Sequence, residues 1–317
     1  MSIHHKPVHH KRLDKINNMT DVIRVIGRGA SLGRSLTLAE AEQVAHWLLT
    51  DQVDEIQLGA LLMMLRLRGE TPEEAAGLAQ GLRQGMSIPN DLQVDVDWPV
   101  YAGKRRQLPW FLLASLALAK QGKRVMLHGA VGTDPDRLYL EPVIRAMGLP
   151  IAQSWDEAKH YLDQHAWVYI PMETFFPKLV GWLNLKQTLG LRSVMHTVAR
   201  LLNPAQAPLS VRGVFHQEYV DLHAKVAQLQ QTEKVIIIRG DGGEAEVSAD
   251  KHIPVLMIEK GKISEHHEPA SDIDRPIAET LTVDEVAKRL LSILHEETTD
   301  EIYGKTTLTR TLAIIAR

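Results

Sequence analysis

The chain has 317 residues, of which 44% are hydrophobic and 24% charged, a composition that is ordinary for a globular protein long enough for two domains. It has no cysteine, which excludes disulfide bonds, thiolate nucleophiles and cysteine-type zinc sites. We find no apolar run of about 18 residues and no signal-like amino terminus, so we expect no membrane span, no secretion and a cytoplasmic location.

The net charge of −3 conceals an uneven distribution of charge. Residues 101–125 carry six positive side chains and no acid, whereas residues 264–301 carry eleven acids and three basic side chains. A basic groove and an acidic opposite face can therefore coexist at a near-neutral total. The alternative is that both segments are merely solvated faces.

The amino-terminal segment contains two histidine pairs, His4–His5 and His9–His10, among several lysines and arginines. We predict a mobile, weakly cationic arm over residues 1–18. A metal-binding histidine tract is the alternative.

Residues 19–90 are predicted to form a helical domain. Apolar spacing predicts helices over residues 21–28, 38–49, 53–67 and 71–86. Thr37 and Glu40 form a capping box, and Thr71 precedes Pro72 at the start of the last helix. We expect these helices to bury one another and to leave an apolar face for a dimer contact.

Residues 91–317 are predicted to form an α/β domain with a mainly parallel sheet, because short strands alternate with helices. The predicted strands are residues 124–127, 167–170, 211–214, 235–238 and 255–258. The predicted helices are residues 138–147, 155–164, 217–230 and 283–295. The acidic, proline-containing stretch 91–99 is interpreted as the crossing between the domains. The helical pattern in residues 300–317 is a candidate addition to the helical domain.

Residues 101–133 are the candidate binding region. Two glycine-bearing loops, at Gly103 and at 129–132, bracket one apolar helix. In an α/β sheet such loops meet at the carboxyl ends of strands, where ligands bind.

Several segments resemble one known family. They are LTLAEAEQV, QLGALLMMLRLRGETPEEAAGL, LGLRSV, LLNPA, GVFH and RGDGGEAEVS. Together they resemble anthranilate phosphoribosyltransferase, in the same order, from Thr37 to Ile263. The resemblance implies the family 3 glycosyltransferase fold, which class II nucleoside phosphorylases share: a small helical domain and a large α/β domain, usually a homodimer through the small domain.

The resemblance also indicates where the donor site should lie. The family holds the diphosphate of phosphoribosyl pyrophosphate with a GTGGDG loop, and only Gly103 remains of it in the matching segment 102–107. His128 and Gly129 remain of a second phosphate loop, and Glu246 of an Asp-Glu metal pair. We therefore predict no transfer from the usual donor, no cofactor and no bound metal.

Cationic side chains surround these degenerate positions. The candidate contacts are Lys104, Arg105, Arg106, Lys178, Lys186, Arg192, Arg200 and Arg212. Arg192 matches the arginine with which the family meets the aromatic carboxylate, and a guanidinium suits phosphate equally. The chain resembles the family's noncatalytic branch, which binds DNA and RNA through a basic groove across the dimer.

We predict a homodimer that binds single- or double-stranded nucleic acid with little sequence preference and with steep salt dependence. One alternative is an enzyme, a phosphoribosyl or other pentosyl transferase with an altered donor or acceptor. Another is a dimeric protein-interaction module.

Other features are weaker. Trp98, Trp155 and Trp182 are candidates to stack on bases, while Trp110 and Trp167 lie in apolar runs typical of a core. His196 is a candidate general base that lacks an apparent acid partner.

Overall fold

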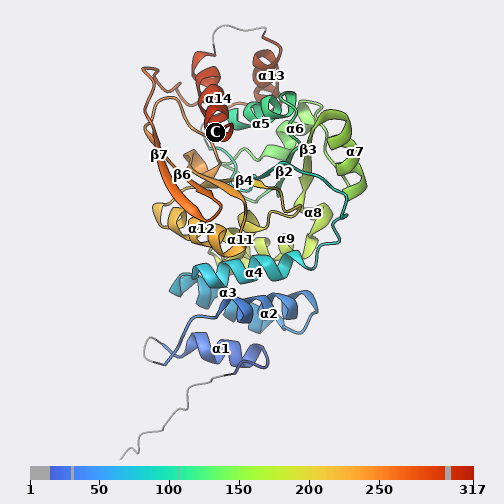
Figure 1. Ribbon diagram of the computed structural model, residues 1–317, viewed down its shortest axis with the longest axis vertical. Coiled ribbons are helices and arrows are strands. Elements are labelled where there is room, and N and C mark those ends of the chain that lie inside the picture. The colour runs from blue at the N-terminus through green and yellow to red at the C-terminus, as the bar shows by residue number, and fades with distance from the viewer. Residues whose placement is uncertain (1–14, 30–31, 106, 297–300) are drawn as a thin grey trace, which may run out of the picture.

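The computed structural model describes residues 15–29, 32–105, 107–296 and 301–317, so Arg106 and the arm of residues 1–14 lie outside the described residues. Helices α1–α4 lie at one end of the molecule and helices α13 and α14 at the other, with the sheet between them (Figure 1). No helix in the described part of the chain is long and apolar enough to span a bilayer.

The predicted amino-terminal helices are confirmed. Their bounds are Met19–Gly27 (α1), Leu38–Leu49 (α2), Glu55–Arg68 (α3) and Pro72–Arg83 (α4). A side chain caps the first turn of each one, and α2, α3 and α4 each begin with a complete capping box. These caps satisfy backbone N–H groups that a helix start otherwise leaves unpaired.

Helices α2 and α4 pack in unusually close contact. A Cβ atom on Gly77 would lie 2.3 Å from the carbonyl oxygen of Leu38, and one on Gly81 would lie 2.6 Å from the Cβ of Ala45. Only glycine allows this approach, so α4 packs against α2 through the face that carries Gly77 and Gly81.

The helical domain contains a second, later segment of the chain. Its helices are Met172–Phe175 (α8), Pro177–Asn184 (α9), Lys186–Leu189 (α10) and Met195–Leu201 (α11). Met172, Leu179, Trp182 and Val198 belong to the same hydrophobic core as the residues of α1–α4. The expected boundary, with everything after residue 91 in the α/β domain, is therefore corrected for this segment.

The sheet has seven strands in the order β3-β2-β1-β4-β5-β6-β7. The first five in that order run parallel, and β6 and β7 are antiparallel to their neighbours, which confirms a mainly parallel sheet. The bounds are Val96–Pro99 (β1), Val125–Gly129 (β2), Trp167–Pro171 (β3), Leu209–Val214 (β4), Lys234–Arg239 (β5), Ile253–Glu259 (β6) and Lys262–Glu268 (β7).

The stretch interpreted as a domain crossing contains an interior strand of the sheet, β1, which lies between β2 and β4, and that interpretation is corrected. Asp97 and Pro99 gave the segment the composition of a loop. All four residues of β1 are buried. Asp97 accepts a hydrogen bond from the hydroxyl of Ser210 and pairs with His128 inside the sheet. A buried acid is tolerated because it is paired and hydrogen-bonded.

Helices cover both faces of the sheet, as the alternation of side chains along the strands requires. One face packs against Trp110–Lys120 (α5), Leu140–Ala146 (α6), Val283–Leu294 (α13) and Ile302–Ile315 (α14). The other face packs against Trp155–His165 (α7) and Gln217–Gln230 (α12).

The carboxyl-terminal helix does not join the helical domain, contrary to the expectation for residues 300–317. Thr307 and Thr311 of α14 accept hydrogen bonds from the backbone N–H groups of Ala249 and Val247, and Gly304 lies against the ring of Trp110. Helix α14 thus packs on α5 at the far end of the α/β domain (Figure 1).

Candidate anion-binding site

The loop after β1 is closed by a carboxylate of the protein itself. Oε1 of Glu244 accepts hydrogen bonds from the backbone N–H groups of Ala102 and Gly103, each at 2.7 Å. Burial raises the pKa of Glu244, although Arg200 and these two N–H groups oppose the rise. The two N–H groups that could hold a bound anion are therefore occupied by an internal one.

A second carboxylate in this region is used in the same way. Nζ of Lys104 lies 2.6 Å from Oε1 of Glu246, and both side chains are almost wholly buried. The other oxygen of Glu246 accepts a hydrogen bond from the backbone N–H of Phe111 at 3.0 Å. Each oxygen of Glu246 thus has a hydrogen-bond partner within the protein.

Arg137 holds the closed loop from outside. Its Nη1 donates hydrogen bonds to the carbonyl oxygens of Ala102, Gly103 and Gly242, at 2.8, 3.1 and 3.2 Å. The backbones of Lys104 and Leu138 form an antiparallel bridge beside it. The connection from Asp241 to Gly243 (η1) thereby serves as a tight turn that presents Glu244 to the loop.

The retained residues of the second loop have structural partners. His128 is fully buried, with Nε2 3.0 Å from Asp97 Oδ1 and Nδ1 2.6 Å from the hydroxyl of Tyr101. A Cβ atom on Gly129 would lie 2.3 Å from the carbonyl oxygen of Val100, the residue that follows β1. The close approach of β2 to that backbone therefore requires glycine. These contacts account for both residues without a bound phosphate.

A basic cleft lies beside the closed loop, between the two domains. It consists of two adjoining cavities, of about 130 and 50 Å³, which share Arg192, His196 and Arg200. Arg66 from α3 lines the first cavity and Lys186 from α10 lines the second. Among the described residues that line them, four carry a positive charge and none carries a carboxylate.

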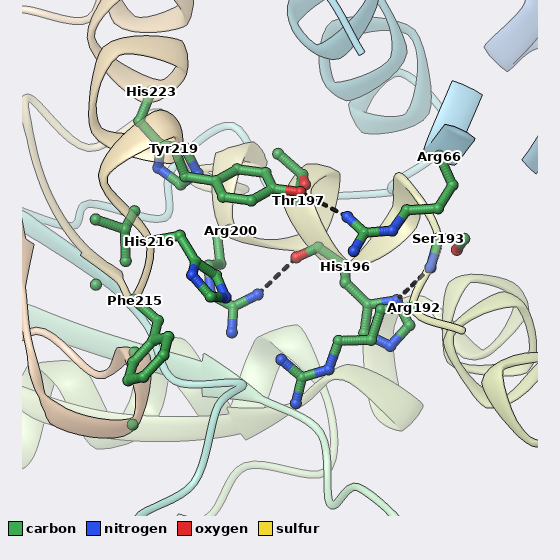
Figure 2. Close-up of a pocket in the computed structure, with 14 residues that line it drawn as sticks. Arg66, Arg192, Ser193, His196, Thr197, Arg200, Phe215, His216, Tyr219 and His223 are labelled. Carbon is green, nitrogen blue, oxygen red and sulfur yellow. Dashed lines mark hydrogen bonds between the residues drawn. The ribbon is translucent and has the colours of Figure 1, made fainter. Parts of the chain in front are cut away.

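Figure 2 shows how side chains converge on the first cavity. Arg200 donates to the carbonyl oxygen of His196 at 2.6 Å, and Arg66 donates to the hydroxyl of Tyr219 at 2.9 Å. The head group of Arg200 lies beside His216, and that of Arg192 lies lower in the view, near the open centre. The first cavity therefore has guanidinium N–H groups from two separate segments of the helical domain, α3 and the segment that includes α11, in its lining.

The charges in the basic cleft act on one another. Burial, together with the positive charges of Arg192 and Arg200, lowers the pKa of His196 to about 3. Burial also lowers the pKa of Arg192, with a contribution from Arg137. The cleft is thus a region of positive potential that an anion would relieve.

Three of the predicted contact residues, Lys186, Arg192 and Arg200, are brought together in the basic cleft. Arg105 is exposed near Asp134, away from the lining of either cavity. Nζ of Lys178 is engaged by Asp51 and by the carbonyl oxygen of Leu49.

Two of the predicted contacts must be corrected. Lys104 is buried against Glu246, and Arg212 is buried within the sheet, where it donates to Ser210 and Gln230. Neither side chain can reach a nucleic acid in this structure. The sequence could not reveal this, because Glu246 lies 142 residues from Lys104.

The aromatic expectations are corrected in part. Trp110 and Trp167 are core residues as predicted, but Trp98 and Trp182 are buried as well, and half-buried Trp155 packs on Phe175. None of the three is an open stacking surface. Phe215 is the exposed aromatic residue at the basic cleft, and sequence analysis did not single it out.

No group of three or more histidine, cysteine, aspartate or glutamate side chains within the described ranges is arranged to hold a metal ion. Arg66, Tyr219 and His223 join the site only through the packing of α3 and α12 on the cleft. No local signal in their own segments distinguishes them from ordinary surface or core residues.

Known proteins resemble the chain over most of its length. Residues 20–86 match the helical bundle domain of a glycosyl transferase family, and residues 114–316 match the family's α/β domain. An uncharacterized Escherichia coli protein, YbiB, is 28% identical over 244 residues, which are 75% of this chain and 76% of that protein. The anthranilate phosphoribosyltransferase of Saccharolobus solfataricus is 27% identical over 230 residues, 73% of this chain and 66% of the enzyme.

Solved structures share the fold. Anthranilate phosphoribosyltransferase from Thermus thermophilus superposes with a TM-score of 0.77 at 20% identity, covering 93% of this chain and 88% of the enzyme. The Saccharomyces cerevisiae enzyme in complex with PRPP and Mg superposes with a TM-score of 0.74 at 16% identity, covering 94% and 87%.

Proposed function

Because the chain belongs to the glycosyl transferase family that combines a helical bundle domain with an α/β domain, we propose that it uses this scaffold to bind nucleic acid through the basic cleft. Lys186, Arg192, Arg200 and Arg66 would contact backbone phosphates. Contacts to backbone phosphates do not distinguish one base from another, so binding is largely independent of the nucleic-acid sequence.

The observation that carries the proposal is the absence of carboxylates from the lining of the basic cleft in the described chain. Four cations line the two adjoining cavities, and no carboxylate is among the described side chains that line them, although the protein as a whole is slightly acidic. Phosphates of a strand would supply the missing charge and release counterions. A protein that binds a neutral ligand has no need of such a concentration of charge.

The residues of the former donor site do not fit a diphosphate and its Mg²⁺. Glu244 occupies the backbone N–H groups of the loop, and both oxygens of Glu246 are taken by Lys104 and Phe111. Mg²⁺ prefers several free oxygen ligands in near-octahedral geometry. These contacts favour binding over transfer.

We also propose that the protein is a homodimer through its helical domain. Ile56 and Leu67 of α3 are exposed by 85% and 77%. The opposite side of α3 buries Leu61, Leu62 and Leu65. A helix that is apolar on two sides requires a second surface to cover it.

Fluorescence anisotropy with labelled oligonucleotides at several salt concentrations tests the proposed function. We expect log Kd to rise linearly with log salt. A Lys186→Gln/Arg192→Gln variant should reduce the slope by about 1.4 to 1.8, since each lost phosphate contact removes roughly 0.7 to 0.9.

The control is Lys262→Gln, an exposed cation on β7 outside the cleft, which should leave the slope unchanged. An unchanged slope in the double variant would mean that the strand lies elsewhere. Absence of binding at low salt, together with turnover of a pentosyl donor, would instead establish an enzyme with an altered site.

A further inference from the structure

Two buried polar side chains in the wall of the first cavity have no hydrogen-bond partner within the described chain. They are Ser193 at Oγ and His223 at Nδ1, in residues that are 5% and 1% exposed. Such groups are rare in folded proteins, because each forfeits a hydrogen bond that water would provide. Both groups lie in the wall of the first cavity, where a bound ligand or a water molecule can complete them.

These two groups suit a different part of a ligand from the part that the arginines suit. Burial lowers the pKa of His223 well below its ordinary value, and Arg212 and Arg200 lower it further, so the imidazole is neutral. A neutral imidazole and a hydroxyl can each donate or accept, whereas an ionised phosphate only accepts. The edge of a nucleobase, which carries both donors and acceptors, matches them.

An aromatic surface lies at the same cavity. Phe215 is 58% exposed, and its ring meets that of His216 edge to face, with centroids 4.8 Å apart. An exposed aromatic side chain beside a cationic groove is the usual platform on which an unpaired base stacks. Figure 2 shows Phe215 and His216 on the side of the cavity opposite Arg66.

The cavity is also larger than a single phosphate contact requires. Its volume of about 130 Å³ is roughly ten times the ~10–15 Å³ that one water molecule needs on this measure. The lining thus combines cations, neutral polar groups and an aromatic ring in a space that accommodates a ring as well as an anion.

From these observations we infer that the first cavity takes one unpaired nucleotide of a bound strand. Its phosphate contacts Arg192 and Arg200, its base stacks on Phe215, and the edge of the base faces His223, on the same side of the cavity as Phe215 (Figure 2). The inference rests on the proposed function and adds a preference. A base in a duplex must leave its stack before it can enter, so single strands bind more tightly.

The test uses the full chain with single-stranded, duplex and abasic oligonucleotides of equal length, the abasic one having phosphates but no bases. Phe215→Ala should weaken single-strand binding about tenfold, as expected for loss of one stacked base. Binding of duplex and abasic strands should change less than about twofold. The fluorescence of a single strand that contains 2-aminopurine should be quenched by the wild-type protein and quenched less by the variant.

Phe215→Tyr should restore binding, and Ile263→Ala, an exposed apolar residue on β7, should change nothing. The inference is overturned if Phe215→Ala binds the single strand as the wild type does, or weakens the abasic strand equally. If the wild-type protein binds no oligonucleotide even at low salt, the proposed function itself fails, which is a distinguishable result.

Discussion

Lys104 shows at the scale of one residue how differently the same side chain can act in a groove and in a core. Its ammonium group is buried against Glu246, which also accepts from the backbone of Phe111. The pair connects the loop after β1 to the segment after β5, two strands that both adjoin β4 in the sheet. Its role in this structure is to keep the former donor loop shut.

Replacing Lys104 with methionine should therefore destabilise the protein, because Glu246 would be left buried and unpaired. Breaking such a pair costs about 3–5 kcal/mol. Urea unfolding followed by tryptophan fluorescence measures it. Arg105→Met, in the exposed neighbour, should change the free energy of unfolding by less than about 0.5 kcal/mol. Equal effects of the two variants would contradict the structural role given to Lys104.

At the scale of elements, the sequence predicts best what local chemistry decides. The Thr37–Glu40 capping box and the Thr71 cap mark helix starts that the structure confirms. Strand β1 was missed because Asp97 and Pro99 are poor strand formers, and only the distant partners His128 and Ser210 make an acid acceptable there. The site is equally hard to predict from sequence, since Arg66 and His223 line one cavity only because tertiary packing brings their helices together.

The contact between α2 and α4 gives the prediction that belongs to this scale. Gly77→Ala would place a Cβ 2.3 Å from the carbonyl oxygen of Leu38, a backbone atom that cannot move without shifting α2. We expect a loss of about 1–3 kcal/mol, typical of overpacking, seen as a lower urea midpoint.

The matched control is Gly181→Ala in α9. No atom lies within 4 Å of the added Cβ there, so the variant should be stabilised by about 0.5–1 kcal/mol through helix propensity. If Gly77→Ala were as stable as Gly181→Ala, the close packing of α2 on α4 would be wrong.

At the scale of the whole molecule, the basic cleft and the exposed face of α3 lie close together, because α3 contributes Arg66 to the cleft. Arg66, which lines the first cavity, lies on α3 next to exposed Leu67. A partner that covered Ile56 and Leu67 would thus place a second cleft close to the first. If both clefts bound the same strand, the second contact would be intramolecular. Its high effective concentration would raise the apparent affinity for nucleic acid without any new type of contact.

This arrangement predicts that Ile56→Asp/Leu67→Asp yields a monomer, because two charges would be buried unpaired at the contact. Sedimentation equilibrium should give half the wild-type mass, with an unchanged circular dichroism spectrum. Ile277→Asp is the control. Ile277 is even more exposed and lies in the segment between β7 and α13, so this variant should leave the mass unchanged.

The monomer keeps Arg192 and Arg200, so it should still bind a short oligonucleotide. A strand long enough to span two clefts should bind the monomer at least tenfold more weakly than it binds the wild-type protein. A double variant with the mass of the wild type would show that α3 faces solvent, and one that lost short-strand binding would show that the partner completes the cleft.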